Sequence, residues 1–293
     1  MTPSALPQDF LVIRPPPKNG SSKAPTPIEA MSHGLVTLPG LPTFKSKQEK
    51  RQWQLEHMAG AFRIFARHGY AEGLSGHMSV RDPVEEAFWI NPLGVHFGML
   101  KASDMILVHL RTGEILGGNA RRPINATGFH IHAAIHSARP DVHAICHAHG
   151  IHGRAWSSFA KPLEMLNQDV CNLFNSHSVY AQYGGLALDG EEGRRIADAL
   201  GNGKGCILMN HGLLTVGSTV DEAAYLFRLM EKSCEVQLLA EAAAANGNLK
   251  KQIILDEEAG YNYKMTSEAE NLYCEFQPEY EYEAFLSGGD FKC

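Results

Sequence analysis

The fold is decided by the stretch NATGFHIHAAIHSARPDVHAICHAH, residues 125–149. Either Asn125 or Thr127 can cap a helix that ends at Arg139-Pro140-Asp141, because a proline disfavours the helical conformation of the residue before it. The apolar run that follows, residues 142–147, predicts a buried strand. A helix that returns directly into a buried strand is typical of a layered α/β domain.

Similar patterns predict further elements on both sides of this stretch. Ser46-Lys47-Gln48-Glu49 has the spacing of a capping box, and apolar residues recur on one helical face after it. Short apolar runs between turn residues predict strands that alternate with the helices. The expected helices cover 47–68, 191–200 and 220–245, and the expected strands cover 77–81, 88–90, 105–110 and 205–209.

We expect three parts along the chain. Residues 1–45 are rich in proline, which regular helices and sheets exclude from their interiors, so they predict an extended arm. This arm is either a disordered leader or a segment that packs on a neighbouring subunit. Residues 46–249 are expected to form one domain. Residues 250–293 are a tyrosine-rich, acidic tail, either a lid over a neighbouring site or a locally packed surface segment.

Composition excludes several classes of protein. The chain has 293 residues, a formal net charge of −6 and no basic cluster interleaved with aromatics, so a nucleic-acid partner is not expected. No apolar run approaches the roughly 18 residues of a membrane helix. The six cysteines occur singly, without a CxxC pair, and the first residues do not resemble a secretion signal. These features predict a soluble cytoplasmic protein with reduced thiols.

Histidines are concentrated in one part of the sequence, where ten of the fifteen fall between His77 and His152. His147 and His149 are two residues apart at the end of a predicted strand, so both side chains point to the same face. His211 follows another apolar run, in Met209-Asn210-His211-Gly212. Three histidines that leave coordination positions open would form a catalytic metal site, because structural zinc sites are normally closed by four protein ligands.

These motifs resemble those of the class II aldolase/adducin family over about residues 50–245. The resemblance implies a three-layer α/β/α fold with a central mixed, largely antiparallel sheet, so that 46–249 would be the catalytic domain. It also implies ring-shaped homo-oligomers, commonly tetramers, and a metal held by His147, His149 and His211. The matching motifs are GLSGHMSVR (73–81), INPLGVH (90–96), HAAIHSARPDVHAICHAH (132–149) and NHGLLTVG (210–217).

The sequence departs from the aldolase pattern at the acid/base residue. The aldolases have a glutamate four residues before a histidine that aligns with His132, and Gly128 stands at that position here. A glycine cannot transfer a proton. The family's phosphate-binding positions are also changed, so we expect an unphosphorylated substrate. Those positions are occupied here by His77, Leu93, Ala126 and Thr127.

Three functions are compatible with these residues. We favour an enzyme with one Fe(II) per subunit, whose three open positions suit a bidentate hydroxy or amino acid and O2, and which oxidatively decarboxylates that small carboxylate. In it, His77 and His96 would orient the carboxylate and His132 would support them. The second function is a Zn(II)-dependent aldolase, with its base among these histidines or at Asp169. The third is a non-catalytic, adducin-like assembly module.

Overall fold

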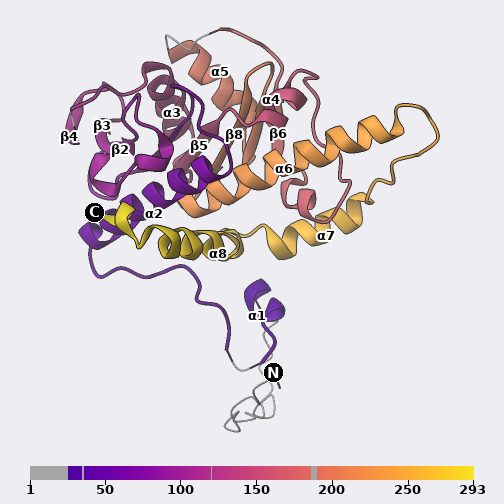
Figure 1. The fold of residues 1–293 in the computed structure, drawn as a ribbon, viewed down its shortest axis with the longest axis horizontal. Helices are drawn as coiled ribbons and strands as arrows, with labels where there is room; N and C mark the ends of the chain where they lie inside the picture. Colours follow the sequence, from indigo (N-terminus) through magenta and orange to yellow (C-terminus); the bar gives the residue numbers. More distant parts are fainter. Residues whose placement is uncertain (1–25, 35, 120, 186–189) are drawn as a thin grey trace, which may run out of the picture. The chain divides into compact units, whose positions relative to one another are not determined.

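This computed structural model describes residues 26–34, 36–119, 121–185 and 190–293. A mixed eight-stranded sheet lies at the centre of the compact unit Gly40–Cys293 (Figure 1). The strand order is β4-β3-β2-β1-β5-β8-β7-β6. All neighbours are antiparallel except β6 and β7. The strands are β1 (His77–Arg81), β2 (Ala87–Ile90), β3 (Ile106–His109), β4 (Ile115–Gly118), β5 (Ala144–Ala148), β6 (His177–Tyr180), β7 (Gly205–Leu208) and β8 (Gly212–Gly217).

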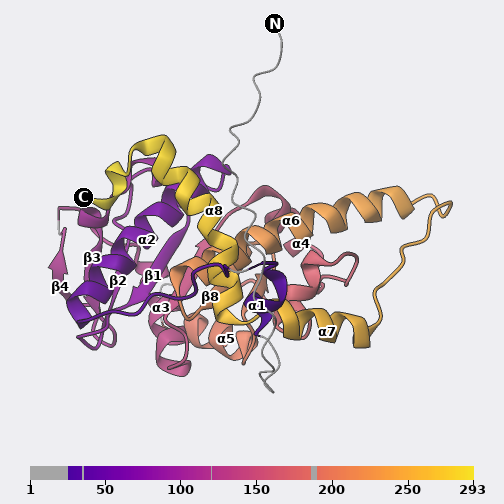
Figure 2. The same ribbon diagram turned by 90° about the horizontal axis from the view of Figure 1, so that it is seen from below.

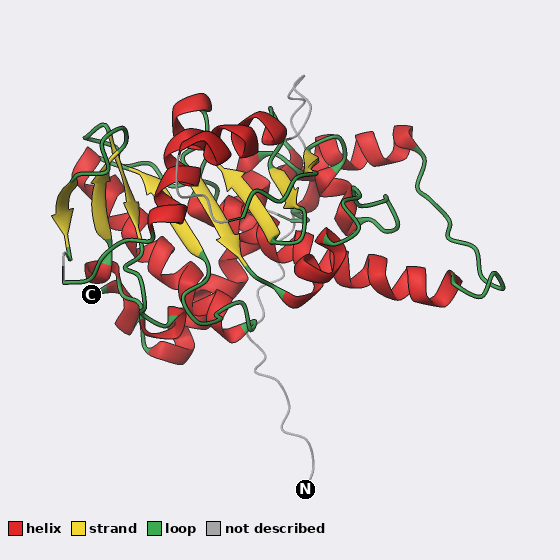
Figure 3. Ribbon diagram, turned by 90° about the horizontal axis from the view of Figure 1, so that it is seen from above, coloured by secondary structure: helices red, strands yellow, loops and turns green. Residues whose placement is uncertain are grey.

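Helices cover both faces of this sheet, as Figures 2 and 3 show. The larger core, on one face, includes Phe62, Phe227 and Phe276 of α2, α6 and α8. The core on the other face includes Ile131 and Ile196 of α3 and α5. The expected three-layer α/β/α fold is therefore confirmed. The helices are α1 (Pro27–Met31), α2 (Lys47–Arg67), α3 (Ala126–Ala138), α4 (Ile151–Ser157), α5 (Gly190–Leu200), α6 (Val220–Ala244), α7 (Asp256–Thr266) and α8 (Ala269–Ser287), with 3-10 turns at Phe97–Met99, Ala102–Asp104, Asp169–Leu173 and Asp290–Lys292.

Helix caps account for the close agreement of the predicted helix boundaries with the structure. The Ser46 hydroxyl accepts a hydrogen bond from the Glu49 N–H at 3.1 Å and so begins α2. Of the two residues that could cap α3, Asn125 is the cap. Its side-chain oxygen accepts a hydrogen bond from the Gly128 N–H at 3.1 Å. Among the described helices, none combines the length and the apolar composition needed to cross a bilayer.

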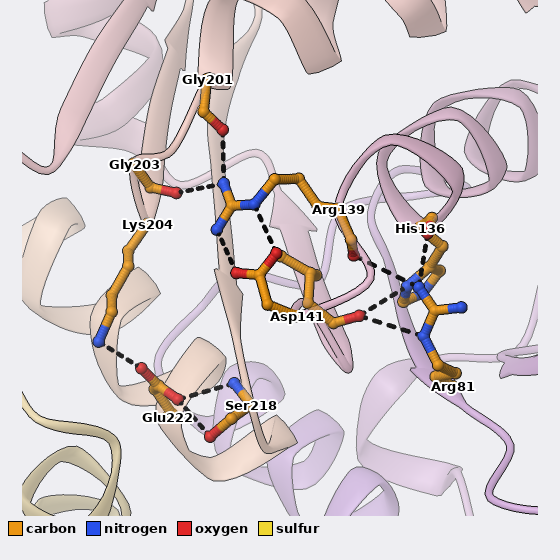
Figure 4. A network of polar contacts seen from close by, with 10 residues as sticks. Arg81, His136, Arg139, Asp141, Gly201, Gly203, Lys204, Ser218 and Glu222 are labelled. Carbon is orange, nitrogen blue, oxygen red and sulfur yellow. Dashed lines mark hydrogen bonds and ion pairs between the residues drawn. The ribbon is translucent and has the colours of Figure 1, made fainter.

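A polar network fixes the corner between α3 and β5 (Figure 4). The Arg139 guanidinium forms two bonds to the Asp141 carboxylate, at 2.8 and 2.7 Å, and donates to the Gly203 carbonyl at 3.1 Å. Arg81, at the end of β1, donates to the carbonyls of His136 and Val142 at 2.5 and 3.3 Å. The Arg-Pro-Asp motif therefore holds α3 against the sheet, which places the histidines of α3 behind β1.

The C-terminal segment differs from the expected tail. Residues 250–293 contain α7 and α8, and they belong to the same compact unit as the sheet, Gly40–Cys293. Leu272 and Phe276 are fully buried in the larger core, so α8 is part of a layer of the fold. The helical pattern of α8 is hard to recognise in the sequence because Pro278 lies inside it and acidic residues interrupt its apolar face.

The N-terminal arm also departs from the expectation, in the part that the structure describes. Residues 27–31 form the short helix α1, with Pro27 at its first position. Proline is tolerated there because the N–H that it lacks has no partner within the helix. Thr26 and Glu29 complete a capping box. The rest of the expected arm up to residue 25 lies outside the described residues.

Candidate metal centre

The three predicted metal ligands lie at the ends of neighbouring strands. His147 is on β5 and His149 follows the end of that strand, whereas His211 lies in the turn between β7 and β8. Strands β5 and β8 are antiparallel, with Ala148 opposite Leu213, so the end of β5 meets the start of β8. The structure therefore brings His211 next to His147 and His149, although it is far from them in the sequence.

The turn that carries His211 requires an unusual backbone. Asn210 has a φ of 57°, in the left-handed region that asparagine tolerates. Gly212 passes so close to the neighbouring strand that a Cβ atom there would lie 3.1 Å from the Ala148 carbonyl oxygen. A glycine at this position therefore lets the turn approach β5, in agreement with the sequence prediction.

The triad, defined as His147, His149 and His211, has the spacing of a metal site. The Nε2 atoms of His147 and His149 are 3.2 Å apart. One ring nitrogen from each of the three residues lies within 4.8 Å of the other two. The ring planes are inclined to one another at 68° to 82°, so the nitrogens converge from different directions. This arrangement could hold one divalent cation and leave further coordination positions open.

A backbone contact fixes the tautomer of His147. Its Nδ1 lies 2.9 Å from the carbonyl oxygen of Leu213, which can only accept a hydrogen bond. Nδ1 therefore carries the proton, and Nε2 keeps its lone pair for the site. Metal-binding histidines commonly donate their second N–H to such a carbonyl, so the residues present fit a divalent metal.

Burial keeps the three rings neutral. It lowers the pKa of His147 well below the usual value and the pKa of His211 to about 4. The pKa of His149 is lowered by burial first and by the charge of Arg154 second. Neutral imidazole is the form that binds a metal ion. The triad therefore retains its free lone pairs into the mildly acidic range.

The same burial predicts that acid destabilises the metal-free protein. Histidines of the unfolded chain bind protons below pH of about 6.5, whereas buried rings with lowered pKa values stay neutral, so acid favours the unfolded state. For each unit by which the pH falls below about 6.5, each such ring should lower the unfolding free energy by about 1.4 kcal/mol. Glu231, whose pKa is raised by burial, acts in the opposite direction. The rings are those of His77, His132, His136, His147 and His211.

Urea unfolding of the metal-free protein between pH of about 5 and about 7 measures this effect. We expect the unfolding free energy to rise with pH across that window. A flat profile would contradict the neutral assignment of the buried rings.

Two of the predicted catalytic histidines lie behind the triad. The ring centroid of His77 is 4.8 Å from that of His147, and the two residues are opposite each other on β1 and β5. Nδ1 of His77 lies 2.7 Å from Nε2 of His132. The other ring nitrogen of His132 lies 2.6 Å from the Ser79 hydroxyl. Both nitrogens of His132 are therefore engaged inside the protein, whereas His77 faces the triad.

The other two residues predicted near the chemistry have different surroundings. His96 is exposed, and its Nδ1 accepts the Gly98 N–H at 3.1 Å as the cap of a 3-10 turn. Asp169 is also exposed and lines a cleft of about 260 Å³ together with Tyr225 and Arg228 of α6. Among the described residues, neither side chain forms a hydrogen bond, ion pair or ring contact with the triad.

A side chain from strand β1 fills the space beside Gly128, the position at which the aldolases have their glutamate. Gly128 is buried in the first turn of α3, and a Cβ atom on it would lie 2.7 Å from Cδ2 and 2.8 Å from Cγ of His77. Side chains do not approach so closely without displacement. The imidazole of His77 therefore occupies the space into which a larger residue 128 would extend.

A buried carboxylate that the sequence did not reveal supports the triad. Oε1 and Oε2 of Glu231, on α6, accept the backbone N–H groups of His152 and Gly153, each at 2.8 Å. These N–H groups belong to the first turn of α4, which begins two residues after His149. Gly150 and Gly153 leave the room for this carboxylate, since a Cβ atom on either would lie less than 3 Å from it. Glu231 therefore anchors the chain that leaves His149.

A second buried carboxylate acts on His211. Glu192, on α5, is buried and accepts the Tyr180 hydroxyl at 3.0 Å. Its negative charge raises the pKa of His211, against the larger lowering by burial. Sequence reasoning missed it because it lies in an ordinary amphipathic helix and approaches His211 only through the packing of α5 on β6 and β7.

Comparison with known proteins places the chain in a family. A family model described as the class II aldolase and adducin N-terminal domain matches residues 56–238. The meiotically up-regulated gene 14 protein of Schizosaccharomyces pombe (strain 972) is 44% identical over 88% of this chain and 99% of its own length. The residues matched by the family model span the eight strands and the three triad positions, and end before α7 and α8.

Two further relatives carry enzyme names. A protein of Streptomyces roseochromogenus subsp. oscitans, 4-hydroxy-3-prenylphenylpyruvate oxygenase/4-hydroxy-3-prenylbenzoate synthase, is 43% identical over 73% of this chain and 79% of its own. The solved structure of L-fuculose 1-phosphate aldolase from Glaciozyma antarctica PI12 is 38% identical, with a TM-score of 0.78, and the match covers 86% of this chain and 96% of that one. The chain belongs to the class II aldolase and adducin family.

Proposed function

We propose that this chain is an Fe(II)- and O2-dependent enzyme that oxidatively decarboxylates a small, unphosphorylated hydroxy or amino carboxylate. The coarser assignment, a metal-dependent enzyme of the class II aldolase type, is supported by the family and by the names of two relatives. The observation that carries the finer proposal is the donor set, three neutral imidazoles with His77 in place of an acidic side chain at Gly128. The oxygenase name of a 43% identical relative agrees with it.

The proposed reaction balances with dioxygen as the oxidant. A 2-hydroxy acid and O2 give the carboxylic acid one carbon shorter, carbon dioxide and water. A bound Fe(II) would supply the activation of O2. The triad would hold the metal through neutral nitrogens, and the Leu213 carbonyl would keep the ring of His147 in its metal-binding orientation.

The surroundings of the site favour an unphosphorylated substrate. Burial lowers the pKa of His77 well below its usual value, so the ring supplies no positive charge to a phosphate. Leu93 and Ala126, at two of the other positions where the sugar-phosphate aldolases bind phosphate, have no polar side-chain atoms. A phosphate would lose several strong hydrogen bonds in this environment.

A Zn(II)-dependent aldolase is the second candidate function. The observations that favour it are the 38% identity to an L-fuculose 1-phosphate aldolase and the buried carboxylate of Glu192 on the His211 side of the site. In that enzyme a carboxylate or His77 would accept the proton that an aldol cleavage releases. The third candidate, a non-catalytic assembly module, predicts a triad whose loss changes no activity.

Metal reconstitution distinguishes these functions. The metal-free protein is loaded anaerobically with Fe(II) or Zn(II) and is assayed with short hydroxy and amino acids. We expect oxygen uptake and carbon dioxide release in equal amounts with Fe(II), and neither with Zn(II). Cleavage that proceeds without oxygen, with either metal, would support the aldolase and overturn the oxygenase. The absence of any turnover with both metals would favour the assembly module.

We also propose, from the family resemblance, that the chain forms a homotetramer with one metal ion per subunit. Light scattering on the purified protein measures the oligomeric state, and metal analysis of the same sample gives the ratio of metal to chain. A monomer, or a ratio far from one, would contradict this proposal.

A further inference from the structure

A row of buried polar side chains connects β1 with α3 behind the triad. His77 and Ser79 lie on the same face of β1, and His132 and His136 are one helical turn apart on α3. The Ser79 hydroxyl lies 2.6 Å from Nδ1 of His132 and 2.9 Å from Nε2 of His136. His77, Ser79, His132 and His136, which we name the buried polar row, are all at most 3% exposed.

The far end of the row sets the direction of every hydrogen bond in it. Nδ1 of His136 lies 3.3 Å from the Val142 carbonyl oxygen, which can only accept, so this nitrogen carries the proton. Nε2 of the neutral His136 ring then accepts from the Ser79 hydroxyl. The Ser79 oxygen in turn accepts from Nδ1 of His132.

The same logic reaches the metal site. Because Nδ1 of His132 carries its proton, Nε2 of His132 must accept, and Nδ1 of His77 donates to it over 2.7 Å. Nε2 of His77 is left without a proton. This nitrogen would lie 3.1 Å from a Cβ atom on Gly128, in the space that the glycine leaves open beside His147.

We propose that the buried polar row locks His77 as a hydrogen-bond acceptor at the metal site, which selects substrates that present a hydroxyl or amine N–H beside the carboxylate. A lone pair repels a carboxylate and attracts a donor, so His77 would contact the hydroxyl or amino group rather than the acid group. Ser79, His132 and His136 are positioning residues. The substrate part of this inference rests on the proposed function.

The tautomer of His77 is measured without turnover. Long-range 1H–15N spectra of the Zn(II)-loaded protein, labelled with 15N-histidine, distinguish protonated from unprotonated ring nitrogens. We expect protonated Nδ1 and unprotonated Nε2 for His77, assigned by comparison with His77→Asn. A His77 ring with a proton on Nε2 would overturn the inference. A correct tautomer in a protein that consumes no oxygen would count against the proposed function alone.

Variants of Ser79 test whether the row causes this tautomer. Ser79→Ala removes the group that joins His132 to His136, so we expect the His77 signals to shift toward a mixture of tautomers and kcat/KM to fall about ten- to hundredfold. Ser79→Thr keeps the hydroxyl and should restore the single tautomer. An unchanged His77 spectrum in Ser79→Ala would show that the row does not fix the ring, and would overturn the inference.

The contact between His77 and Gly128 is tested separately by stability. Gly128→Ala should lower the urea midpoint because its Cβ atom meets the His77 ring, and the loss should be smaller in a His77→Asn background. Gly190→Ala is the matched control, since a Cβ atom there meets only the Arg194 guanidinium at 3.9 Å. An equal loss in both backgrounds would contradict the placement of His77 over Gly128.

Discussion

His147→Ala is expected to abolish tight binding of a divalent metal without unfolding the protein. His147 is nearly fully buried, and its Nε2 points toward that of His149 at 3.2 Å. Removing a residue that only hydrogen-bonds to a metal ligand typically weakens metal binding 10- to 100-fold. Removing the ligand itself should therefore weaken metal binding more than about 100-fold. Titration with Zn(II) against a competing chelator measures this affinity, and circular dichroism checks the fold.

The control for this variant is His143→Ala. His143 directly precedes β5 and lies outside the triad, so its removal should leave the metal affinity within about twofold of the original. Stoichiometric binding of undiminished affinity in His147→Ala would show that the three rings do not form the metal site. An equal loss in both variants would indicate a general effect on the fold.

The triad could be predicted from the sequence because each of its parts is local. Side-chain alternation along a strand places His147 and His149 on one face, and the glycine after His211 marks a turn. The antiparallel pairing of β5 with β8 then brings the two ends together. The cap at Ser46 was predictable for the same reason, since a cap acts within three residues, and the cap of α3 was narrowed to Asn125 or Thr127.

The parts that the sequence did not reveal depend on contacts between distant elements. His77 meets Gly128 only because β1 packs against α3. The sequence shows that both positions depart from the aldolase pattern, but not that the two residues share one space in the fold. Glu192 and Glu231 belong to helices whose patterns are those of ordinary surface-layer helices. The sequence did not reveal that α8 belongs to the core. Its apolar residues contact α2 and α6, but acidic residues and a proline interrupt their helical pattern in the sequence.

Glu231→Ala is expected to cost the largest share of stability of any single change near the site. The carboxylate is 2% exposed and accepts two N–H groups of the first turn of α4, which would lose their partners. Hydrogen bonds to charged groups contribute about 1.5–3 kcal/mol each, and part of this is recovered by water that enters the space. We therefore expect the unfolding free energy to fall by about 2–4 kcal/mol in urea unfolding.

The same substitution should also weaken metal binding, because α4 begins two residues after His149. We expect a 10- to 100-fold loss of Zn(II) affinity, typical of residues that orient a metal ligand. Glu235→Ala is the matched control, since Glu235 lies one turn further along α6 with a side chain that is 41% exposed, and its removal should change stability by less than about 0.5 kcal/mol. A Glu231→Ala protein that loses stability but keeps its full metal affinity would show that α4 does not position His149.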